Sequence, residues 1–309
     1  MKKTLTLLLV AGISVTCYAQ KTQLRLNLQK DSTYYLTTKT NMRITETIQG
    51  QDMVINTTIG AKMSHKVTAL TDTSYELSVA MESIMMHTDE GRQQTPDVNT
   101  DDTSKHDLFS KIMSSMLHRP IIVEVTKRGH VLDVKNSDNL YAGIYQLFPE
   151  ISEDKKEQIK AVLKKSFGDK SFKMGFQDAF TALPGTPVSI NDKWTSMSIF
   201  ETMVSARINT TYSLVNIVNN VCTIHGDATV QPLINNGGYV AFNNIPMRFN
   251  NVTGSVVSDY KMDKTTGWIR EAKLIKNIKM DADIKDSPQV PGGMIMPMSV
   301  YADIEINGQ

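Results

Sequence analysis

The side chains that could bind a metal ion in this chain are its six histidines, two cysteines and 32 acidic residues. Zinc sites commonly use histidines four residues apart on a helix, a His-x-His pair or a Cys-x-x-Cys turn. None of these spacings occurs in the sequence. The densest polar cluster, between Asp101 and Asp107, stands where a helix is expected to begin, and capping explains it better than a metal does. We therefore expect neither a metal site nor a cofactor. The histidines are His65, His87, His106, His118, His130 and His225.

Catalytic motifs are missing as well. The sequence has no Gly-x-Ser-x-Gly nucleophile elbow and no Ser-x-x-Lys with its companion motifs. The segment Asp259–Glu271 resembles a calcium loop in outline, but Lys264 replaces the obligatory glycine and Arg270 the bidentate acid. We expect no catalytic residue, and the sequence favours a protein that is not an enzyme without deciding the question. A hydrolase with an unrecognised carboxylate pair stays open as an alternative, although an aromatic content of 7% is low for a sugar-binding cleft.

Methionine is the unusual component of the composition, with 18 residues. Its flexible thioether suits adaptable surfaces for apolar ligands, and thioethers also bind Cu(I). The third explanation for the high methionine content, and the one we favour, is that methionine side chains fill an irregular core. If an apolar ligand is bound, the candidate lining residues are Met85, Met113, Met116, Met294, Met296 and Met298.

The first nineteen residues have the pattern of a cleavable export signal. A basic Met1-Lys2-Lys3 start is followed by a short apolar run and the small-x-small ending Cys17-Tyr18-Ala19, which predicts cleavage between Ala19 and Gln20. We expect an exported protein in the periplasm or at the outer membrane. A lipoprotein anchored through Cys17 is the less favoured alternative, because the residues before it match a lipobox poorly.

Net charge argues against nucleic acid as a partner. The chain carries +1, and removal of residues 1–19 would remove Lys2 and Lys3, leaving 1 − 2 = −1. A near-neutral protein has no electrostatic attraction to polyanions. The mature chain has no further stretch of transmembrane length. It also keeps a single cysteine, Cys222, so a disulfide framework is excluded.

Strand-like segments dominate both ends of the chain. Residues rich in Thr, Val, Ile and Tyr alternate with polar ones between turn residues, the pattern of half-buried strands. We predict strands at 33–48, 53–70, 75–87, 194–204, 207–218, 221–231, 252–262, 267–276, 278–285 and 298–306.

Helical periodicity occupies the middle. Ser104 and Ser152 are expected to cap two of the helices, and Gly168 to end one of them. Apolar residues recur at helical spacing in the first three, so each can cover the apolar face of a sheet. The predicted helices are 105–117, 137–148, 153–167 and a short one around 172–180.

Two hairpins share one shape. The segments 123–134 and 258–270 each place a glycine, Gly129 or Gly267, at the end of a polar turn and then resume a strand. We therefore expect one mainly β (α+β) domain over 20–309: a first β unit at about 31–135, a helical middle at about 137–182 and a related β unit at about 188–309. The predicted fold is a strongly curved antiparallel sheet, or partial barrel, with short amphipathic helices on its concave face.

Two further segments carry a resemblance. The sequence LPGTPVSINDKW at 183–194 and DKTTGWI at 263–269, with the Thr-rich strands, resembles a bacterial exported family of unknown function, domain of unknown function 6263. The resemblance implies an exported β-rich protein and assigns no functional residue. The function we expect is non-catalytic: binding of an apolar, lipid-like ligand or a partner protein in the cell envelope. A structural or interaction module at the outer membrane is the alternative.

Overall fold

The computed structural model describes residues 21–90, 97–102, 104, 107–201, 205–233, 238–242 and 245–309. The expected export signal and its cleavage site between Ala19 and Gln20 lie outside these residues and stay a prediction.

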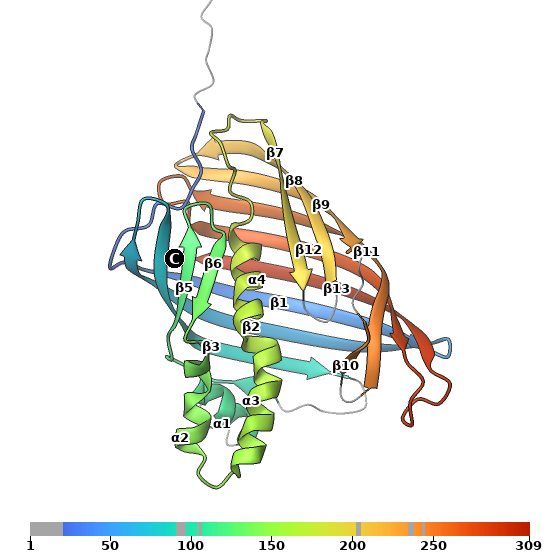
Figure 1. Cartoon of the computed structure of the whole chain (residues 1–309). Helices are drawn as coiled ribbons and strands as arrows, with labels where there is room; N and C mark the ends of the chain where they lie inside the picture. Colours follow the sequence, from blue (N-terminus) through green and yellow to red (C-terminus); the bar gives the residue numbers. More distant parts are fainter. Residues whose placement is uncertain are drawn as a thin grey trace, which may run out of the picture.

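Within this part of the chain, thirteen strands form one open antiparallel sheet (Figure 1). The prediction of a mainly β protein with a curved antiparallel sheet is confirmed. The strands are β1 (Thr33–Ile48), β2 (Gln51–Leu70), β3 (Ser74–Asp89), β4 (Val98–Asn99), β5 (Ile121–Thr126), β6 (Val131–Lys135), β7 (Lys193–Glu201), β8 (Ser205–Val218), β9 (Val221–Pro232), β10 (Val240–Phe242), β11 (Ile245–Asp263), β12 (Ile269–Ile284) and β13 (Met294–Gly308).

The first and last long strands lie side by side in the middle of the sheet. The strand order is β6-β5-β3-β2-β1-β13-β12-β11-β9-β8-β7, with β4 paired to β3 and β10 to β11. Each half of the chain is therefore a meander, and the two meanders join where β1 pairs with β13. The two edges of the sheet, β6 and β7, are connected in sequence by the helical segment. This places the helices across the opening of the curved sheet.

Helix α4 lies on the inner face of the sheet, where short helices were expected, and α3 extends from it past the β3 edge (Figure 1). Two details of the helix prediction are wrong. The first helix begins at residue 108, not 105, because the Asp107 side chain caps it by accepting a hydrogen bond from the Ser110 N–H at 2.8 Å. The apolar stripe predicted for the third helix is also incomplete, since Val162 is 64% exposed. The helical elements are α1 (Leu108–Ser115), the 3₁₀ helix η1 (Ser137–Tyr141), α2 (Ala142–Leu147), α3 (Glu153–Phe167) and α4 (Asp169–Phe180).

The predicted break between strands 267–276 and 278–285 is also wrong, because β12 runs through Asn277 without interruption. Asn277 pairs with Ser255 on one side and Tyr301 on the other. Two flanking ladders hold the backbone extended there, which outweighs the low strand propensity of asparagine.

Both glycine turns identified in the sequence have the expected backbone. Gly129 and Gly267 have φ values of +78° and +68°. A Cβ on Gly129 would lie 2.4 Å from the Phe180 Cβ, and one on Gly267 would lie 2.2 Å from the Arg25 carbonyl oxygen. Only glycine fits either position, because the backbone is left-handed and the neighbour is already in contact.

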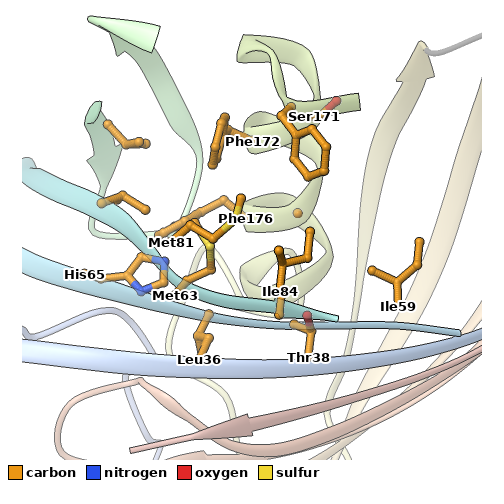
Figure 2. A pocket seen from close by; sticks show the side chains of 15 residues that line it. Leu36, Thr38, Ile59, Met63, His65, Met81, Ile84, Ser171, Phe172 and Phe176 are labelled. Atoms are coloured by element: carbon orange, nitrogen blue, oxygen red, sulfur yellow. The ribbon is translucent and has the colours of Figure 1, made fainter. Parts of the chain in front are cut away.

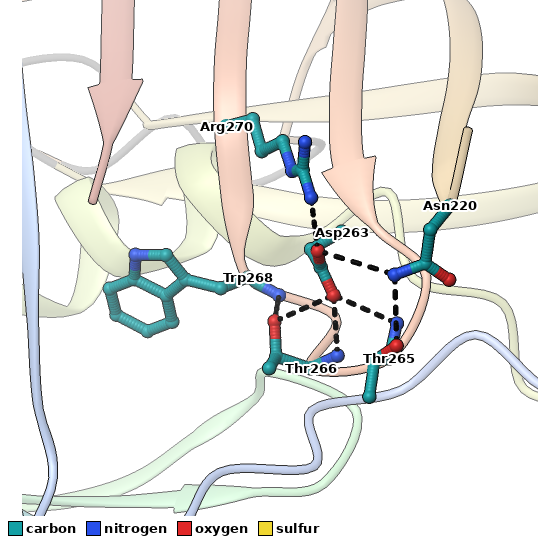
Figure 3. Close-up of polar contacts among 6 residues, drawn as sticks. All are labelled: Asn220, Asp263, Thr265, Thr266, Trp268 and Arg270. Carbon is teal, nitrogen blue, oxygen red and sulfur yellow. Dashed lines mark hydrogen bonds and ion pairs between the residues drawn. The ribbon is translucent and has the colours of Figure 1, made fainter. Parts of the chain in front are cut away.

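The β11–β12 turn is held by Asp263 (Figure 3). Its Oδ1 accepts hydrogen bonds from the backbone N–H groups of Thr265 and Thr266, each at 2.9 Å, and its Oδ2 pairs with Arg270 at 2.6 Å. Burial raises the pKa of this carboxyl, but the hydrogen bonds from Arg270, Thr266 and Thr265 outweigh it, so the pKa lies below its usual value.

The polypeptide before β1 ties the two glycine turns together. The Leu26 N–H donates to the Lys127 carbonyl at 2.7 Å, and the Asn27 N–H donates to the Thr266 carbonyl at 2.8 Å. Leucines on alternate residues of this segment are buried, so its apolar side enters the main core. They are Leu24, Leu26 and Leu28.

The two halves repeat a further backbone pattern. Asp31 and Asn191, which precede β1 and β7, have positive φ values of 64° and 72°. The Asp31 N–H donates to the Val67 carbonyl and the Asn191 N–H to the Leu214 carbonyl, at 2.9 and 2.8 Å. A register shift directly follows Val67 in the β2–β3 ladder and Leu214 in the β8–β9 ladder. The same backbone pattern and register shift therefore occur in both halves of the sheet.

Candidate functional site

An apolar cavity lies between the sheet and α4, and its floor follows from strand alternation. Successive side chains of a strand point to opposite faces, so every second residue lines the same surface. On β2 the inward residues are Ile59, Ala61, Met63 and His65, and Leu36 and Thr38 continue this surface on β1. Figure 2 shows these side chains rising from the sheet toward the helix. Val79, Met81 and Ile84 of β3 and Val123 of β5 complete the floor.

The roof of the cavity is helical. Phe167 ends α3, and one side of α4 supplies Ser171, Phe172, Gly175 and Phe176. Their spacing of three and four residues places them on one face of the helix. A Cβ added to Gly175 would meet no atom within 4 Å, so the helix leaves open space at this point.

The cavity has a volume of about 220 Å³ and is only partly enclosed. For comparison, an engineered apolar cavity of about 150 Å³ stays dry and binds benzene. Of the fifteen lining residues, eleven have apolar side chains, and none is charged. The other four are Thr38, His65, Ser171 and Gly175. A site of this kind binds hydrocarbon through the hydrophobic effect and offers few polar contacts.

His65 is the most unusual lining residue. It is 4% exposed, and its Nδ1 has no hydrogen-bond partner in the structure. Aromatic rings surround the imidazole, with the ring centroids of Trp268 and Phe176 at 5.3 and 6.0 Å. Burial lowers the pKa of His65 to about 4, and a hydrogen bond with the Tyr34 backbone offsets a small part of that shift. The ring is therefore uncharged at neutral pH.

Polar contacts hold the end of α4 over the sheet. The Tyr260 hydroxyl donates to the Asp178 carbonyl oxygen at 2.9 Å, and Lys276 Nζ pairs with Asp178 Oδ2 at 2.7 Å. The Trp194 indole N–H donates to the Ala182 carbonyl at 3.1 Å, which connects β7 to the end of the helix. These contacts all come from the second half of the sheet, where β7, β11 and β12 hold the end of the helix.

None of the six methionines proposed from the sequence lines this cavity. Met85 lies on β3 and is 38% exposed, next to inward-facing Ile84. Met113 and Met116 are fully buried in the main core around α1. Met294, Met296 and Met298 gather instead with Met247 and Ile284 in a separate cluster on β11–β13. The methionines that line the cavity are Met63 and Met81.

A second hollow over β7–β9 is larger but polar. Threonine, serine, asparagine and aspartate side chains make up most of its lining, and it is more open to solvent than the apolar cavity. Most of its lining side chains can hydrogen-bond to water, so water is its expected occupant.

Two exposed histidines contact aspartate carboxylates. His225 lies between Asp259 at 2.7 Å and Asp227 at 3.2 Å, and His87 lies 2.6 Å from Asp97. In the part of the chain that the structure describes, no group of three or more His, Cys, Asp or Glu side chains could hold a metal ion. His106, the histidine of the polar cluster before α1, is outside those residues.

From the sequence, His65 is only one of six potential metal ligands, and its position in the cavity was not predicted. A signal was present, since Ile59, Ala61, Met63 and His65 alternate on one strand with a polar residue at the end. Alternation does not reveal which face a helix will cover.

The fold and the cavity define a class of protein: an open antiparallel sheet curved around helices, with an apolar cavity between sheet and helix. The chain belongs to the family of unknown function DUF6263, whose model matches residues 72–269. The match covers 198 of 309 residues and includes the cavity walls formed by β3, β5, α3 and α4. No curated protein matches the chain.

Several solved structures are similar to the chain at low sequence identity. A lipovitellin structure, described by its lipid–protein interactions, has 8% identity and a TM-score of 0.49 over 92% of this chain. The chain spans 25% of the lipovitellin chain. An outer membrane channel of Pseudomonas putida F1 has 5% identity and a TM-score of 0.22, covering 91% of this chain and 97% of the channel. Salmonella typhi OmpF in complex with daunomycin has 8% identity and a TM-score of 0.22, and the match covers 89% of this chain and 98% of the OmpF chain. At these scores no functional conclusion follows.

Among the described residues, no helix combines the length and apolar character that a membrane span requires.

Proposed function

We propose that this chain is a non-catalytic cell-envelope protein that binds an apolar, lipid-like ligand in the cavity between β1–β3 and α4. The single observation that carries the proposal is the uncharged, largely apolar lining of a partly open cavity of about 220 Å³. A ligand chain that enters it would gain about 25 cal/mol for each Å² of apolar surface removed from water.

Two features support binding rather than simple packing. The lining side chains come from four strands and two helices, and their positions are fixed by the ladder and by the contacts of Asp178. Open space persists at Gly175 in the middle of the roof. A preformed cavity reduces the ordering cost of binding.

The cellular location is proposed from residues 1–19, whose basic start, apolar run and Cys17-Tyr18-Ala19 ending are those of an export signal. We place the mature protein in the periplasm or at the outer membrane. An apolar ligand there needs a carrier, because free lipid is poorly soluble in the aqueous compartment.

The test is binding of phenylnaphthylamine, a dye whose emission rises in apolar surroundings, by the mature chain. Gly175→Leu would fill the cavity from its roof, and we expect it to weaken dye binding about tenfold or more, which corresponds to about 1.4 kcal/mol. Lys170→Leu is the matched control, since it adds a leucine to an exposed position of the same helix outside the lining.

Equal dye affinity in the wild type and the Gly175→Leu variant would place the dye elsewhere and refute the cavity as the site. Native mass spectrometry of protein from its own host would identify a bound lipid directly. We expect one apolar molecule per chain, and loss of that molecule in Gly175→Leu.

A further inference from the structure

The apolar cavity is closed at one end and more open at the other. At the closed end, the side chains of His65, Leu36 and Val79 are buried. Toward the other end Thr38 and Ile59 are only half-buried, and Figure 2 shows His65 and Ile59 at opposite ends of the row of lining side chains. The open end therefore faces the stretch of β1 that follows Thr38 and the stretch of β2 that precedes Ile59.

The inner face of the sheet stays largely apolar beyond the cavity. On β1, alternation places Thr40, Met42 and Ile44 on the face that carries Leu36 and Thr38 in the cavity, and all three are half-buried. The intervening residues lie on the opposite face, which is polar and mostly exposed. They are Lys39, Asn41 and Arg43. The apolar character therefore belongs to one face of the strand and is directed to the inside of the curved sheet.

Neighbouring strands continue this inner surface. Residues that lie opposite one another in an antiparallel ladder share a face. Ile44 lies opposite Ile55 on β2 and opposite Val300 on β13, and Val300 lies opposite Ile278 on β12. Val300 and Ile278 in turn pack against a buried apolar cluster formed by β8, β9, β11 and β12. Together with Met42, these four side chains form an apolar strip that continues the floor of the cavity.

No helix in the described part of the chain covers the apolar strip. Figure 1 shows α3 and α4 toward one end of the long strands, whose opposite ends extend beyond the helices. Two charged residues border the strip. Lys276 of β12 pairs with Asp178 of α4 at 2.7 Å, and Glu46 is the next inward residue of β1 after Ile44. The strip therefore begins at the open end of the cavity and ends at a polar border near the ends of the strands.

Length indicates which ligand fits the cavity and the strip together. At the ratio of benzene to an engineered cavity of about 150 Å³, a cavity of about 220 Å³ holds roughly nine carbon atoms. From Leu36 to Ile44 there are eight positions (44 − 36), which span about 26 Å at roughly 3.3 Å per residue. One acyl chain of a membrane lipid spans about 15 Å, half of a bilayer core of about 30 Å. Such a chain is too large for the cavity alone but fits along the cavity and the strip.

We propose that the ligand is a lipid with a long acyl chain of the kind found in membranes, whose tail end fills the cavity and whose remaining methylenes lie on the apolar strip. This inference rests on the proposed function and specifies the ligand class and the extent of the same site. Met42 and Ile44 are then ligand-contact residues. The head of the lipid, whether charged or not, stays in water at the polar border.

The experiment measures displacement of phenylnaphthylamine by lysophosphatidylcholines with acyl chains of eight, twelve and sixteen carbons, each below its micelle concentration. The head is the same throughout and carries no net charge, so only the chain length changes. Each methylene removed from water strengthens binding by up to about fourfold. For the wild type we expect affinity to rise at least about tenfold between twelve and sixteen carbons, because this part of the chain gains contact with the strip.

Met42→Glu places a carboxylate in the middle of the apolar strip. We expect it to reduce the gain between twelve and sixteen carbons to less than about threefold. Binding of the eight-carbon lipid should stay within about twofold of the wild type, because the short chain is held by the cavity. Asn41→Glu is the matched control, since it adds the same charge at the adjacent exposed position on the outer face, and it should keep the wild-type gain.

The outcomes separate the two proposals. If no chain length displaces the dye from the wild type, the proposed function fails. If the eight-carbon lipid displaces it but affinity does not rise between twelve and sixteen carbons, the cavity stands and the strip is not part of the site. An equal rise in Met42→Glu and Asn41→Glu would also overturn the role of the strip, since the longer chain would then lie elsewhere.

A second measurement keeps the inference testable if Met42→Glu does not fold. The methyl ¹³C resonances of Met42, Ile44 and Val300 in the wild-type protein report contact with the strip. We expect them to shift on saturation with the sixteen-carbon lipid and to stay unchanged with the eight-carbon lipid. No shift with the sixteen-carbon lipid, under conditions where it displaces the dye, would refute the contact.

Discussion

The imidazole of His65 meets the indole of Trp268 edge-on, with ring centroids 5.3 Å apart and an interplanar angle of 67°. His65 lies on β2 in the first half of the chain, whereas Trp268 follows the β11–β12 turn in the second. The Trp268 indole N–H also donates to the Tyr35 carbonyl oxygen at 3.2 Å, and the centroid of its ring lies 4.9 Å from that of Phe180 at the end of α4. One tryptophan therefore joins the floor of the cavity, its roof and the repeated turn. Changes in that turn are expected to affect the site as well as the fold.

Gly267→Ala tests how tightly the second turn is packed. An alanine there would adopt a left-handed backbone and place its Cβ 2.2 Å from the Arg25 carbonyl oxygen. We expect a loss of about 3 kcal/mol in the free energy of unfolding, measured by urea denaturation. Gly50→Ala is the control, because Gly50 has a φ of +79° but no atom within 4 Å of the added Cβ. It should lose only about 1 kcal/mol. Equal losses at the two positions would contradict the packing of Arg25 against the turn.

Asp263→Ala tests the polar contacts of the same turn. The substitution removes the acceptor of two backbone N–H groups and the partner of Arg270. We expect a loss of about 1–3 kcal/mol in unfolding free energy. Asp154→Ala, at an exposed position in the first turn of α3, should change it by less than about 0.5 kcal/mol. Similar thermal unfolding curves for the two variants would show that the turn does not depend on Asp263.

His65 makes the stability of the protein sensitive to acid. Its pKa is about 4 in the folded state against a usual value of 6.5, so the unfolded chain binds more protons between these values. The stability that the neutral His65 ring contributes to the folded protein is fully present above about pH 6.5 and is lost as the pH falls toward 4. From the pKa difference, we expect His65 to lower the free energy of unfolding by about 3 kcal/mol between neutral pH and pH 4.

The measurement for that prediction is urea unfolding at pH 7 and at pH 4. His65→Phe removes the titrating group, so the variant should lose less stability than the wild type over the same interval. A variant that loses as much as the wild type would show that His65 does not titrate with a lowered pKa.

Gly175→Ala should stabilise the protein. Gly175 lies inside α4 with no atom within 4 Å of an added Cβ, so alanine raises helix propensity without a clash. We expect the free energy of unfolding, measured by urea denaturation, to increase by about 0.5–1 kcal/mol. Gly143→Ala in α2 is the contrasting variant. Its added Cβ would lie 2.4 Å from the Ser115 carbonyl oxygen, so this substitution should destabilise the folded protein. Destabilisation by Gly175→Ala would contradict the open space in the roof.

Much of the fold could be predicted from the sequence because the signals are local. The alternation in β1–β3, the glycines at 129 and 267 and the helical spacing in 153–180 each depend on residues a few positions apart. The errors have local causes too. Ser104 and Asp107 are both good caps, and only the structure shows which side chain reaches the first turn. Asn277 has the propensity of a turn residue, but two neighbouring strands hold it in a ladder.

By itself the sequence determined that the chain is mainly β, that its middle is helical and that two turns repeat, since each depends on short-range periodicity and backbone preference. Only the tertiary structure decided which residues face one another. The pairing of β1 with β13 and the passage of α4 across the sheet select Met63, Met81 and His65 for the cavity and leave Met85 outside it. The physical reason is that period-two alternation divides a strand into two faces without marking either, and the long-range packing of the helix chooses between them.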